Sequence, residues 1–523
     1  MKNYKYISGL CVIAAVAFSS CSKDFLTLYP EGNLNEGIFY KTPRDFQLAV
    51  VGAYTPLRDI ANNAFWMDEM RSDNATFDYY AKDRGNAARE NISTFMDETT
   101  NGVTQVRYQA AYTGIGRANA ILDHLGGNTS LTDSLKNLIA GETKALRGHY
   151  YFDLVRNFGG VPLLLHEVQQ VSDAYLPRAT EEEVYTQVIN DLKDALTLLP
   201  APTFKVPETG RMNKGVAATE LAMVYMQRKD YENALPLLQS VTTMGYTLMT
   251  NFNAIFNPAN KSADVNKELI FDVQYQSGTT GQSSSFIYRF IPHMPKTTNV
   301  LGVTFNTTGY GGWNVPTDDL MSLFEPGDSR FNASVGIVEG TLNDAQDFEA
   351  SGVVSAVGYT PKPGIVAKYF CKKYYYLPVP DINQNTDQNW PLYRYGEVLL
   401  MLAECLNETG KPGDALPYFN QIRVRAFGNT DHNIATTDPV QLRTAIAKER
   451  RRELAFENKR WQDLIRTGQA ISVMNAYGVI AKQKYPYLLP QSFNVTPERL
   501  LYPIPQREME LNKNLIQNPG YTN

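Results

Sequence analysis

Hydrophobic positions in the last quarter of the chain recur with the period of α-helices. Between residues 393 and 408, apolar residues follow one another at three- and four-residue steps, the spacing of one buried helix face. A Gly-Lys-Pro-Gly break follows, and Asp414 is placed to cap a second helix. A third amphipathic segment, 445–468, ends on Gly468, where a C-terminal cap is expected. No such helix buries its stripe alone, so the pattern predicts a helical scaffold.

The same periodicity fills much of the first half of the chain. A Thr42-Pro43 start predicts a helix, and Thr180 with Glu183 predicts a capping box at another helix start. Three short motifs of one shape lie at the ends or starts of these segments and indicate a repeated helical hairpin: DALTLL at 194–199, NALPLL at 233–238 and DALPYF at 414–419.

Between the two helical parts, the texture of the sequence changes. From 246 to 392, Gly, Ser, Thr, Asn and Pro are frequent and the helical period fades. A structureless loop of that length is improbable, so we expect an irregular subdomain inserted between repeats. Residues 469–523 are expected to be mostly extended. The predicted fold is therefore mainly α, a superhelix of tetratricopeptide-like helical hairpins with one irregular, loop-rich subdomain.

The first twenty residues have the pattern of a targeting segment. Lys2 and Lys5 precede an apolar run over 7–18 that is too short to span a bilayer. Cys21 follows two serines, a junction that resembles a bacterial lipobox. We expect 1–20 to be a signal peptide and Cys21 to carry lipid, with 21–42 as a tether. An ordinary secretory signal is the alternative.

The composition of the chain argues against nucleic acid as a partner and suits the recognition of a ligand. The chain has 523 residues, 43% of them hydrophobic and 20% charged, an ordinary globular mixture. The net charge of −5 offers no basic field for nucleic acid. Tyrosine is abundant, with 32 residues, which suits a surface that recognises ligands. Whether Cys371 and Cys405 pair is left open by the sequence.

Four linked segments resemble the C-terminal signature of the SusD/RagB family. They are RYGEVLLMLAE, FNQIRVRA, ERRRELAFENKRWQDLIRTG and YPIPQREMELNKNLIQNPGY, in this order. The resemblance implies a surface lipoprotein that captures nutrients for a SusC-like, TonB-dependent outer-membrane barrel. Together with the change in composition at 246–392, it divides the mature chain into an N-terminal helical region (43–245), an irregular ligand-binding subdomain (246–392) and a C-terminal region (393–523).

Catalytic chemistry is not supported by the sequence. The five histidines are scattered without ligand spacing, so we expect no metal and no cofactor. Asp318-Asp319 and Glu181-Glu182-Glu183 could be read as the paired carboxylates of a glycosidase, but they fit the first turns of helices better. The run of three arginines at 450–452 lies between glutamates and predicts an ion-paired helix face.

Recognition of a sugar requires an aromatic platform beside planar polar groups. Aromatic residues on expected loops are therefore the candidates, and Trp66 and Trp313 are favoured. The glycines before Trp313 would let the backbone approach a ligand. The candidate ligand-binding residues fall in three clusters: Trp66, Asp73, Asn74, Tyr79, Tyr80 and Arg84 (with Phe65); Tyr310, Trp313 and Asn314; and Tyr375 and Trp390 (with Tyr374 and Tyr376).

The expected function is capture of oligosaccharides as the lid of the barrel. An oligopeptide cargo on the same architecture is the alternative, because tyrosine also recognises peptides. A glycan-cleaving enzyme is the less supported reading.

Overall fold

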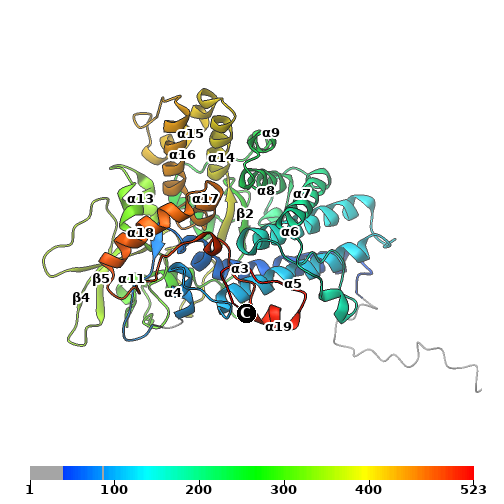
Figure 1. Cartoon of the computed structure of the whole chain (residues 1–523). Coiled ribbons are helices and arrows are strands. Elements are labelled where there is room, and N and C mark those ends of the chain that lie inside the picture. Colours follow the sequence, from blue (N-terminus) through cyan, green and yellow to red (C-terminus); the bar gives the residue numbers. More distant parts are fainter. Residues whose placement is uncertain (1–38, 85–86, 523) are drawn as a thin grey trace, which may run out of the picture.

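Helices dominate the computed structural model, which describes residues 39–84 and 87–522 (Figure 1). The expected signal peptide, Cys21 and most of the expected tether lie outside the described residues. No helix among the residues described is long and apolar enough to cross a membrane. The helices of the N-terminal region are α2 (Pro43–Tyr54), α3 (Pro56–Ala64), α4 (Ala87–Ser93), α5 (Gly102–Leu125), α6 (Asp133–Phe158), α7 (Glu181–Leu198), α8 (Lys214–Gln227) and α9 (Tyr231–Thr242), with the π-helical turn η2 (Phe65–Glu69) and the 3-10 turns η3 (Val171–Ala174) and η4 (Val206–Glu208).

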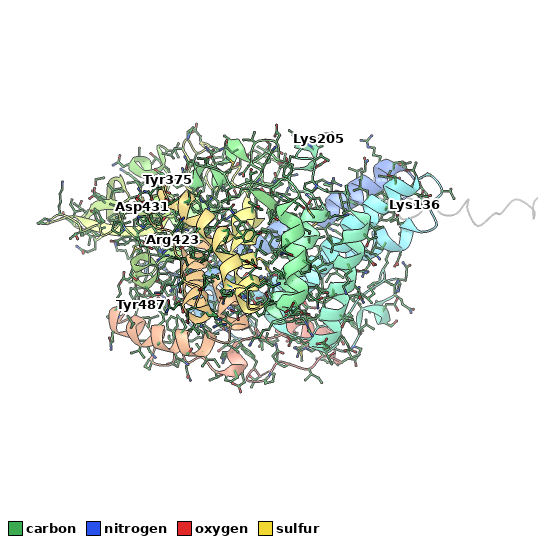
Figure 2. The ribbon with its side chains drawn as sticks, turned by 90° about the horizontal axis from the view of Figure 1, so that it is seen from above. Lys136, Lys205, Tyr375, Arg423, Asp431 and Tyr487 are labelled. Carbon is green, nitrogen blue, oxygen red and sulfur yellow. The ribbon has the colours of Figure 1, made fainter. Side chains whose placement is uncertain are left out.

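The helices pack as a row of antiparallel neighbours. Each of α5 to α8 packs on the next, and α9 then packs on α14 (Tyr395–Glu408), although more than a hundred residues separate the two in sequence. Beyond α14 lie α15 (Pro412–Phe427) and α16 (Pro439–Leu454), as Figure 2 shows from above. A hairpin buries its apolar face only against a neighbour, so the row continues past the inserted region. The prediction of a tetratricopeptide-like helical fold is confirmed.

The inserted region folds into short strands and short helices. β2 (Leu269–Val273) pairs with β7 (Trp390–Arg394), β4 (Val335–Leu342) pairs with both β5 (Phe348–Val354) and β6 (Val366–Cys371), and all these pairs are antiparallel. The hairpin of β4 and β5 projects at one end of the molecule (Figure 1). The 3-10 turns η5 (Phe252–Phe256) and η6 (Pro258–Asn260) precede β2. Between the strands lie α10 (Phe286–Phe290), α11 (Thr298–Leu301), α12 (Asp318–Ser322) and α13 (Ser329–Ser334).

Helix starts follow the capping chemistry of the sequence. The Thr42 side chain accepts from the backbone N–H of Asp45, and the Asp45 carboxylate accepts from the backbone N–H of Thr42. Thr180 and Glu183 form the same reciprocal pair at α7, as predicted. Asp414 is different: α15 already begins at Pro412, so this carboxylate lies in the first turn instead of capping it.

The C-terminal region departs from the sequence-based prediction in two places. The expected third helix is two helices, α16 and α17 (Arg460–Arg466), separated by a break in which Phe456 and Asn458 have positive φ. Residues 469–523 are not mostly extended, because they contain α18 (Ala470–Lys484) and α19 (Gln506–Leu511), with the 3-10 turn η7 (Pro497–Arg499). Gly468 does end α17 in the left-handed region, as expected for a C-terminal cap.

A buried ion network joins the C-terminal helices to the inserted region. Arg394 contacts the carboxylates of Glu268, Glu453 and Glu457, and Glu453 also contacts Arg330 and Arg425. The Arg394 and Glu453 side chains are 1% and 0% exposed. Buried charges of this kind need partners on every side, and here they have them. The arginines of 450–452 are also ion-paired, as predicted.

The two cysteines of the described chain are separate. Cys371 and Cys405 are both buried and free, so the pairing that the sequence left open does not occur. Burial raises the pKa of both thiols well above the ordinary value, and each packs as a small apolar residue.

A candidate ligand-binding site of aromatic rings and arginines

A two-residue strand pair brings two of the candidate clusters together. β1 (Ala75–Thr76) pairs with β3 (Val315–Pro316). On either side of this pair, the Asp78 backbone N–H donates to the Gly312 carbonyl at 2.7 Å, and that of Thr317 donates to the Asn74 carbonyl at 3.0 Å. The segment 73–80 therefore lies directly against 310–316. A single site built from both candidate clusters requires this contact.

Trp66 and Trp313 are packed against each other at the inner end of this junction. Their rings meet edge to face with centroids 6.0 Å apart. Trp66 is 2% exposed and Trp313 is 5% exposed. Trp66 lies not in a loop, as the sequence-based prediction assumed, but in η2, a π-helical turn that continues α3. Such turns occur frequently at functional sites. The indole N–H groups of both residues have no hydrogen-bond acceptor among the described residues.

A line of ring contacts runs from these indoles to the surface. Phe77 lies 6.1 Å from Trp313 and 5.7 Å from Tyr487, measured between centroids. Tyr487 stacks on Tyr79 at 4.1 Å with an interplanar angle of 10°, and both residues are half-buried. Tyr485 contacts Tyr487 at 5.6 Å. The candidates Trp66, Trp313 and Tyr79 thus belong to one continuous aromatic structure, which we call the ring line.

Two arginines lie over the indole end of the ring line. The Arg89 guanidinium is 4.4 Å from the Trp66 ring centroid and 5.9 Å from that of Trp313. The Arg289 guanidinium is 5.3 Å from the Trp66 ring. Among the described residues, neither arginine forms an ion pair, and the Arg89 Nε atom is buried without an acceptor. Burial lowers the pKa of Arg89, and burial together with the charge of Arg89 lowers that of Arg289 to about 10.

Tyr80 and Arg84 border the surface end of the ring line. The Arg84 guanidinium lies 5.3 Å from the Tyr79 ring and is ion-paired with Glu90. Tyr80 stacks on His293 at 5.1 Å, and its hydroxyl donates to Asp347 at 2.9 Å. Both candidates are therefore placed around one rim.

Asp73 and Asn74 lie in the same segment but are committed to the fold. The Asp73 carboxylate accepts from Arg460 at 2.7 and 2.9 Å and is buried. Although burial opposes it, Arg460 and Arg451 hold the pKa of Asp73 below its ordinary value. Asn74 donates to Glu69 at 3.1 Å and accepts from Arg451 at 2.9 Å. Their partners leave these two side chains little to offer a ligand.

The loop before β3 uses its glycines for internal packing. A Cβ atom on Gly312, which has φ of +76°, would lie 2.4 Å from the His293 ring. The close approach that the sequence suggested for a ligand is thus made to His293. Tyr310 is half-buried and donates to Asn383 at 2.9 Å. Asn314 is fully buried with φ of +55°, and its amide has no partner among the described residues.

The third candidate cluster lies away from the surface end of the ring line, although the Phe65 ring links Trp390 to Trp66, with centroids 6.5 Å and 4.1 Å away. Trp390 is 1% exposed and stacks on Tyr374 at 4.7 Å inside the main hydrophobic core. Tyr375 packs beside Phe370 in a second core and donates to the Val300 carbonyl at 2.5 Å. Figure 2 shows Tyr375 well apart from Tyr487.

The carboxylate pairs occupy helix starts, as predicted. Asp318 and Asp319 lie in the first turn of α12, where they contact Lys484 and Arg451, and residues 181–183 form the first turn of α7. Among residues 39–84 and 87–522, no three His, Cys, Asp or Glu side chains are grouped so as to hold a metal ion. A cavity of about 590 Å³ lies elsewhere, between α2, α6 and residues 200–213, and none of the candidates lines it.

Sequence reasoning missed five residues of the ring line and its surroundings: Phe77, Arg89, Arg289, His293 and Tyr487. Arg289 carried a signal, because it is a lone charge within the apolar run FIYRFIP. Tyr487 lies far along the chain from the other aromatic residues, and no local pattern links it to Tyr79.

Comparisons with known proteins agree with this architecture. Two family models match, the SusD family over residues 267–521 and a model described as starch-binding associating with outer membrane over residues 43–226. A SusD-like protein of Formosa agariphila is 28% identical over 547 residues, which cover 100% of both chains. The starch-binding protein SusD of Bacteroides thetaiotaomicron is 25% identical over 78% of this chain and 76% of its own length.

Solved structures give the same picture. A laminarin binding SusD-like protein superposes with a TM-score of 0.72 at 26% identity, covering 92% of this chain and 100% of that one. A surface glycan-binding protein A from Bacteroides fluxus, 22% identical, superposes with a TM-score of 0.72 over 92% of this chain and 100% of its own, a likeness of fold alone. The two family models match successive parts of the chain and together cover most of the described residues. The Formosa agariphila relative aligns with the chain over its whole length, which supports the same assignment. This chain belongs to the SusD family (SusD/RagB).

Proposed function

We propose that this protein is a lipid-anchored protein of the outer-membrane surface that captures oligosaccharides and acts as the lid of a SusC-like, TonB-dependent transporter. Its membership of the SusD family supports this role, as do the names of relatives that bind starch and laminarin. The relatives are named for binding and not for cleavage, which agrees with a role without catalysis.

The observation that carries the proposal is the surface end of the ring line. A pyranose ring has one flat C–H face that packs on an aromatic ring, and a rim of hydroxyls that needs polar partners. The pair of Tyr79 and Tyr487 is partly exposed, with Tyr485 beside it, and offers the ring surface that their mutual stacking leaves uncovered. Arg84 and the hydroxyl of Tyr80 stand at its rim. Tyr310 is proposed as a further contact, and Trp66 and Trp313 form the floor.

The test replaces the surface rings and leaves the floor intact. Alanine at Trp66 or Trp313 would open a cavity and cost about 3–5 kcal/mol of stability, so lost binding there would not identify a contact. Tyr79→Ala and Tyr487→Ala avoid this problem. Because an aromatic contact contributes about 0.5–1.5 kcal/mol, each change is expected to weaken binding by up to about tenfold.

Binding is measured as retardation of the purified mature chain in native gels that contain single polysaccharides, followed by calorimetry with oligosaccharides of the retained polymer. Tyr175→Ala is the matched control, because Tyr175 is an exposed tyrosine remote in sequence from the ring line. If both ring variants bind like the control, the proposed site is wrong. If the chain retains only peptides, the alternative of oligopeptide cargo replaces the glycan. Product formation that one carboxylate substitution abolishes would make the protein an enzyme.

The transport role has its own test. Cys21→Ala is expected to release the chain from the outer-membrane fraction, because acylation of this cysteine is the proposed anchor. The chain should copurify with a barrel encoded beside it, and Tyr487→Ala should leave that association intact. Failure to copurify would argue against the lid and leave glycan capture standing.

A further inference from the structure

Within residues 39–84 and 87–522, Arg89 and Arg289 have no carboxylate partner, whereas most of the other arginines there have one. Elsewhere in the described chain, buried guanidinium groups such as those of Arg71, Arg107 and Arg147 contact aspartates at 2.5–2.8 Å. Among the described residues, the Arg289 side chain forms one hydrogen bond, from Nε to Ser285 Oγ at 2.8 Å, and the Arg89 side chain forms none. Both cations lie over the same Trp66 ring, close enough for the charge of Arg89 to lower the pKa of Arg289.

This arrangement holds two positive guanidinium groups close together without a carboxylate among the described residues that would neutralise them. Two cations that share a partly buried place repel each other, and each has lost part of its hydration. The indole face attracts a guanidinium by about 0.5–2 kcal/mol, which offsets part of this cost. A further anion would remove the repulsion, and the described part of the chain does not supply one.

The polar side-chain atoms of Arg89, Arg289, Trp66 and Trp313 are all donors. Each guanidinium offers several N–H groups, and the indole N–H groups of Trp66 and Trp313 have no acceptor among the described residues. A neutral sugar hydroxyl both donates and accepts, so it suits a mixed set of partners. A carboxylate or a sulfate ester only accepts, and planar guanidinium groups bind such oxyanions through paired hydrogen bonds.

We propose that Arg89 and Arg289 form the anion subsite of this protein, which therefore takes acidic oligosaccharides that carry a carboxylate or sulfate group. This inference rests on the proposed function and adds the chemical class of the cargo. Both arginines are partly exposed whereas the indoles beneath them are buried, so a ligand meets the guanidinium groups first. The sugar ring next to the bound anion would then extend toward Tyr79 and Tyr487.

The experiment compares matched polysaccharides in native gels: laminarin, amylose and galactomannan as neutral polymers, polygalacturonate and alginate as carboxylated ones, and carrageenans as sulfated ones. The wild-type chain is expected to retain at least one acidic polymer, and the retention should weaken as salt is raised. The carboxyl-reduced or desulfated form of the retained polymer then identifies which anion is read.

The variants are Arg89→Gln, Arg289→Gln and the double change. Because a hydrogen bond to a charged group contributes about 1.5–3 kcal/mol, each single change should weaken binding of the acidic polymer about ten- to hundredfold. Arg89→Lys and Arg289→Lys keep the charge but lose the planar pair of donors, so they should lie between. Arg507→Gln, an exposed arginine on α19, is the control and should change binding less than twofold.

Thermal unfolding shows whether these variants are folded, and the outcomes separate cleanly. If the chain retains neutral polymers as strongly as acidic ones, or if the double variant holds the acidic polymer as tightly as wild type, the anion subsite is wrong and glycan capture stands. If no acidic polymer is retained, the subsite is also wrong. If only acidic peptides bind, the proposed glycan function and the proposed subsite for acidic oligosaccharides are both wrong.

Discussion

Two groups of arginines in this protein are partly or wholly buried, and they differ in whether carboxylates neutralise their charge. Arg394 and Arg330 sit in the interior with side chains 1% and 0% exposed, and each contacts several carboxylates. Arg89 and Arg289 are half-buried on an indole ring and have no carboxylate partner among the described residues. In the first, or complete, group, carboxylates of the fold neutralise each cation. In the second, or unmatched, group, guanidinium N–H groups remain without acceptors among the described residues.

The difference separates structure from function. A buried ion pair stabilises only when every charge is matched, and the first group meets that condition by joining α14, α16 and the inserted region. Unmatched cations lower the stability of a free protein, so a fold that needs only stability has no use for them. Perturbed, unsatisfied charges are therefore candidates for binding.

The largest expected effect comes from breaking the complete group. Arg394→Met leaves Glu268, Glu453 and Glu457 without their shared cation, and removal of one partner from a buried network costs about 3–5 kcal/mol. Urea unfolding of the mature chain measures this as a lower transition midpoint. Arg443→Met, which removes an exposed arginine paired with Glu408, is the control and should cost less than about 1 kcal/mol. Equal losses in the two variants would contradict the contrast.

Acid should act on the complete group and not on the unmatched one. Although burial opposes it, Arg425, Arg394 and Arg330 hold the pKa of Glu453 well below its ordinary value of 4.5. As pH falls through about 4.5, the unfolded chain takes up a proton at this glutamate before the folded chain does, so stability is present above that pH and is lost below it. We expect unfolding midpoints to fall steeply between about pH 5 and pH 3. The double variant of Arg89 and Arg289 should lose stability in the same window, and a flat profile for the wild type would refute the argument.

Removal of the unmatched cations should cost little. Arg89→Gln with Arg289→Gln ends the repulsion and the loss of hydration but also two contacts with the Trp66 ring, so the stability at neutral pH should change by less than about 1 kcal/mol. The folded pKa of Arg289 lies below its ordinary 12.5, which means that at neutral pH its charge lowers stability and that this cost disappears as pH rises past about 10. Urea unfolding at pH 7 provides the measurement. A loss of 3 kcal/mol or more would make the pair structural.

The smallest change is expected at the rim. Arg84 is exposed and paired with Glu90, and such surface pairs contribute about 0–1 kcal/mol. Arg84→Ala should therefore leave the unfolding midpoint almost unchanged while it weakens oligosaccharide binding. Calorimetry on the same preparation compares both quantities, and a fall in stability without any change in binding would remove Arg84 from the site.

Local chemistry made much of the fold predictable. The capping boxes at Thr42 and Thr180 involve residues three apart, so the sequence contains every atom that determines where these helices start. The break after α16 is different, since nothing near Phe456 announces it. There the Glu69 carboxylate, far away in sequence, accepts from the backbone N–H groups of Phe456 and Asn458 at 2.8 and 2.9 Å. A tertiary contact overrides the helical pattern.

The candidate site was predictable only as neighbourhoods. Segments 65–84 and 310–314 were both identified from loop-like aromatic residues, and β1 and β3 do bring them together. Which rings are exposed could not be read from the pattern, because burial of Trp66 and Trp313 depends on each other and on the arginines above them. Whether an arginine has a carboxylate partner is likewise decided by the tertiary fold, so Arg89 and Arg289 escaped notice.

The ring line draws on three distant parts of the chain: η2 and the segment that follows it, the loop before β3, and Tyr487 beyond α18. A fragment that holds all three must span at least residues 65–487. During synthesis the ring line therefore stays incomplete until Tyr487 has been added. A chain truncated before Tyr487 therefore lacks part of the proposed ligand-binding site.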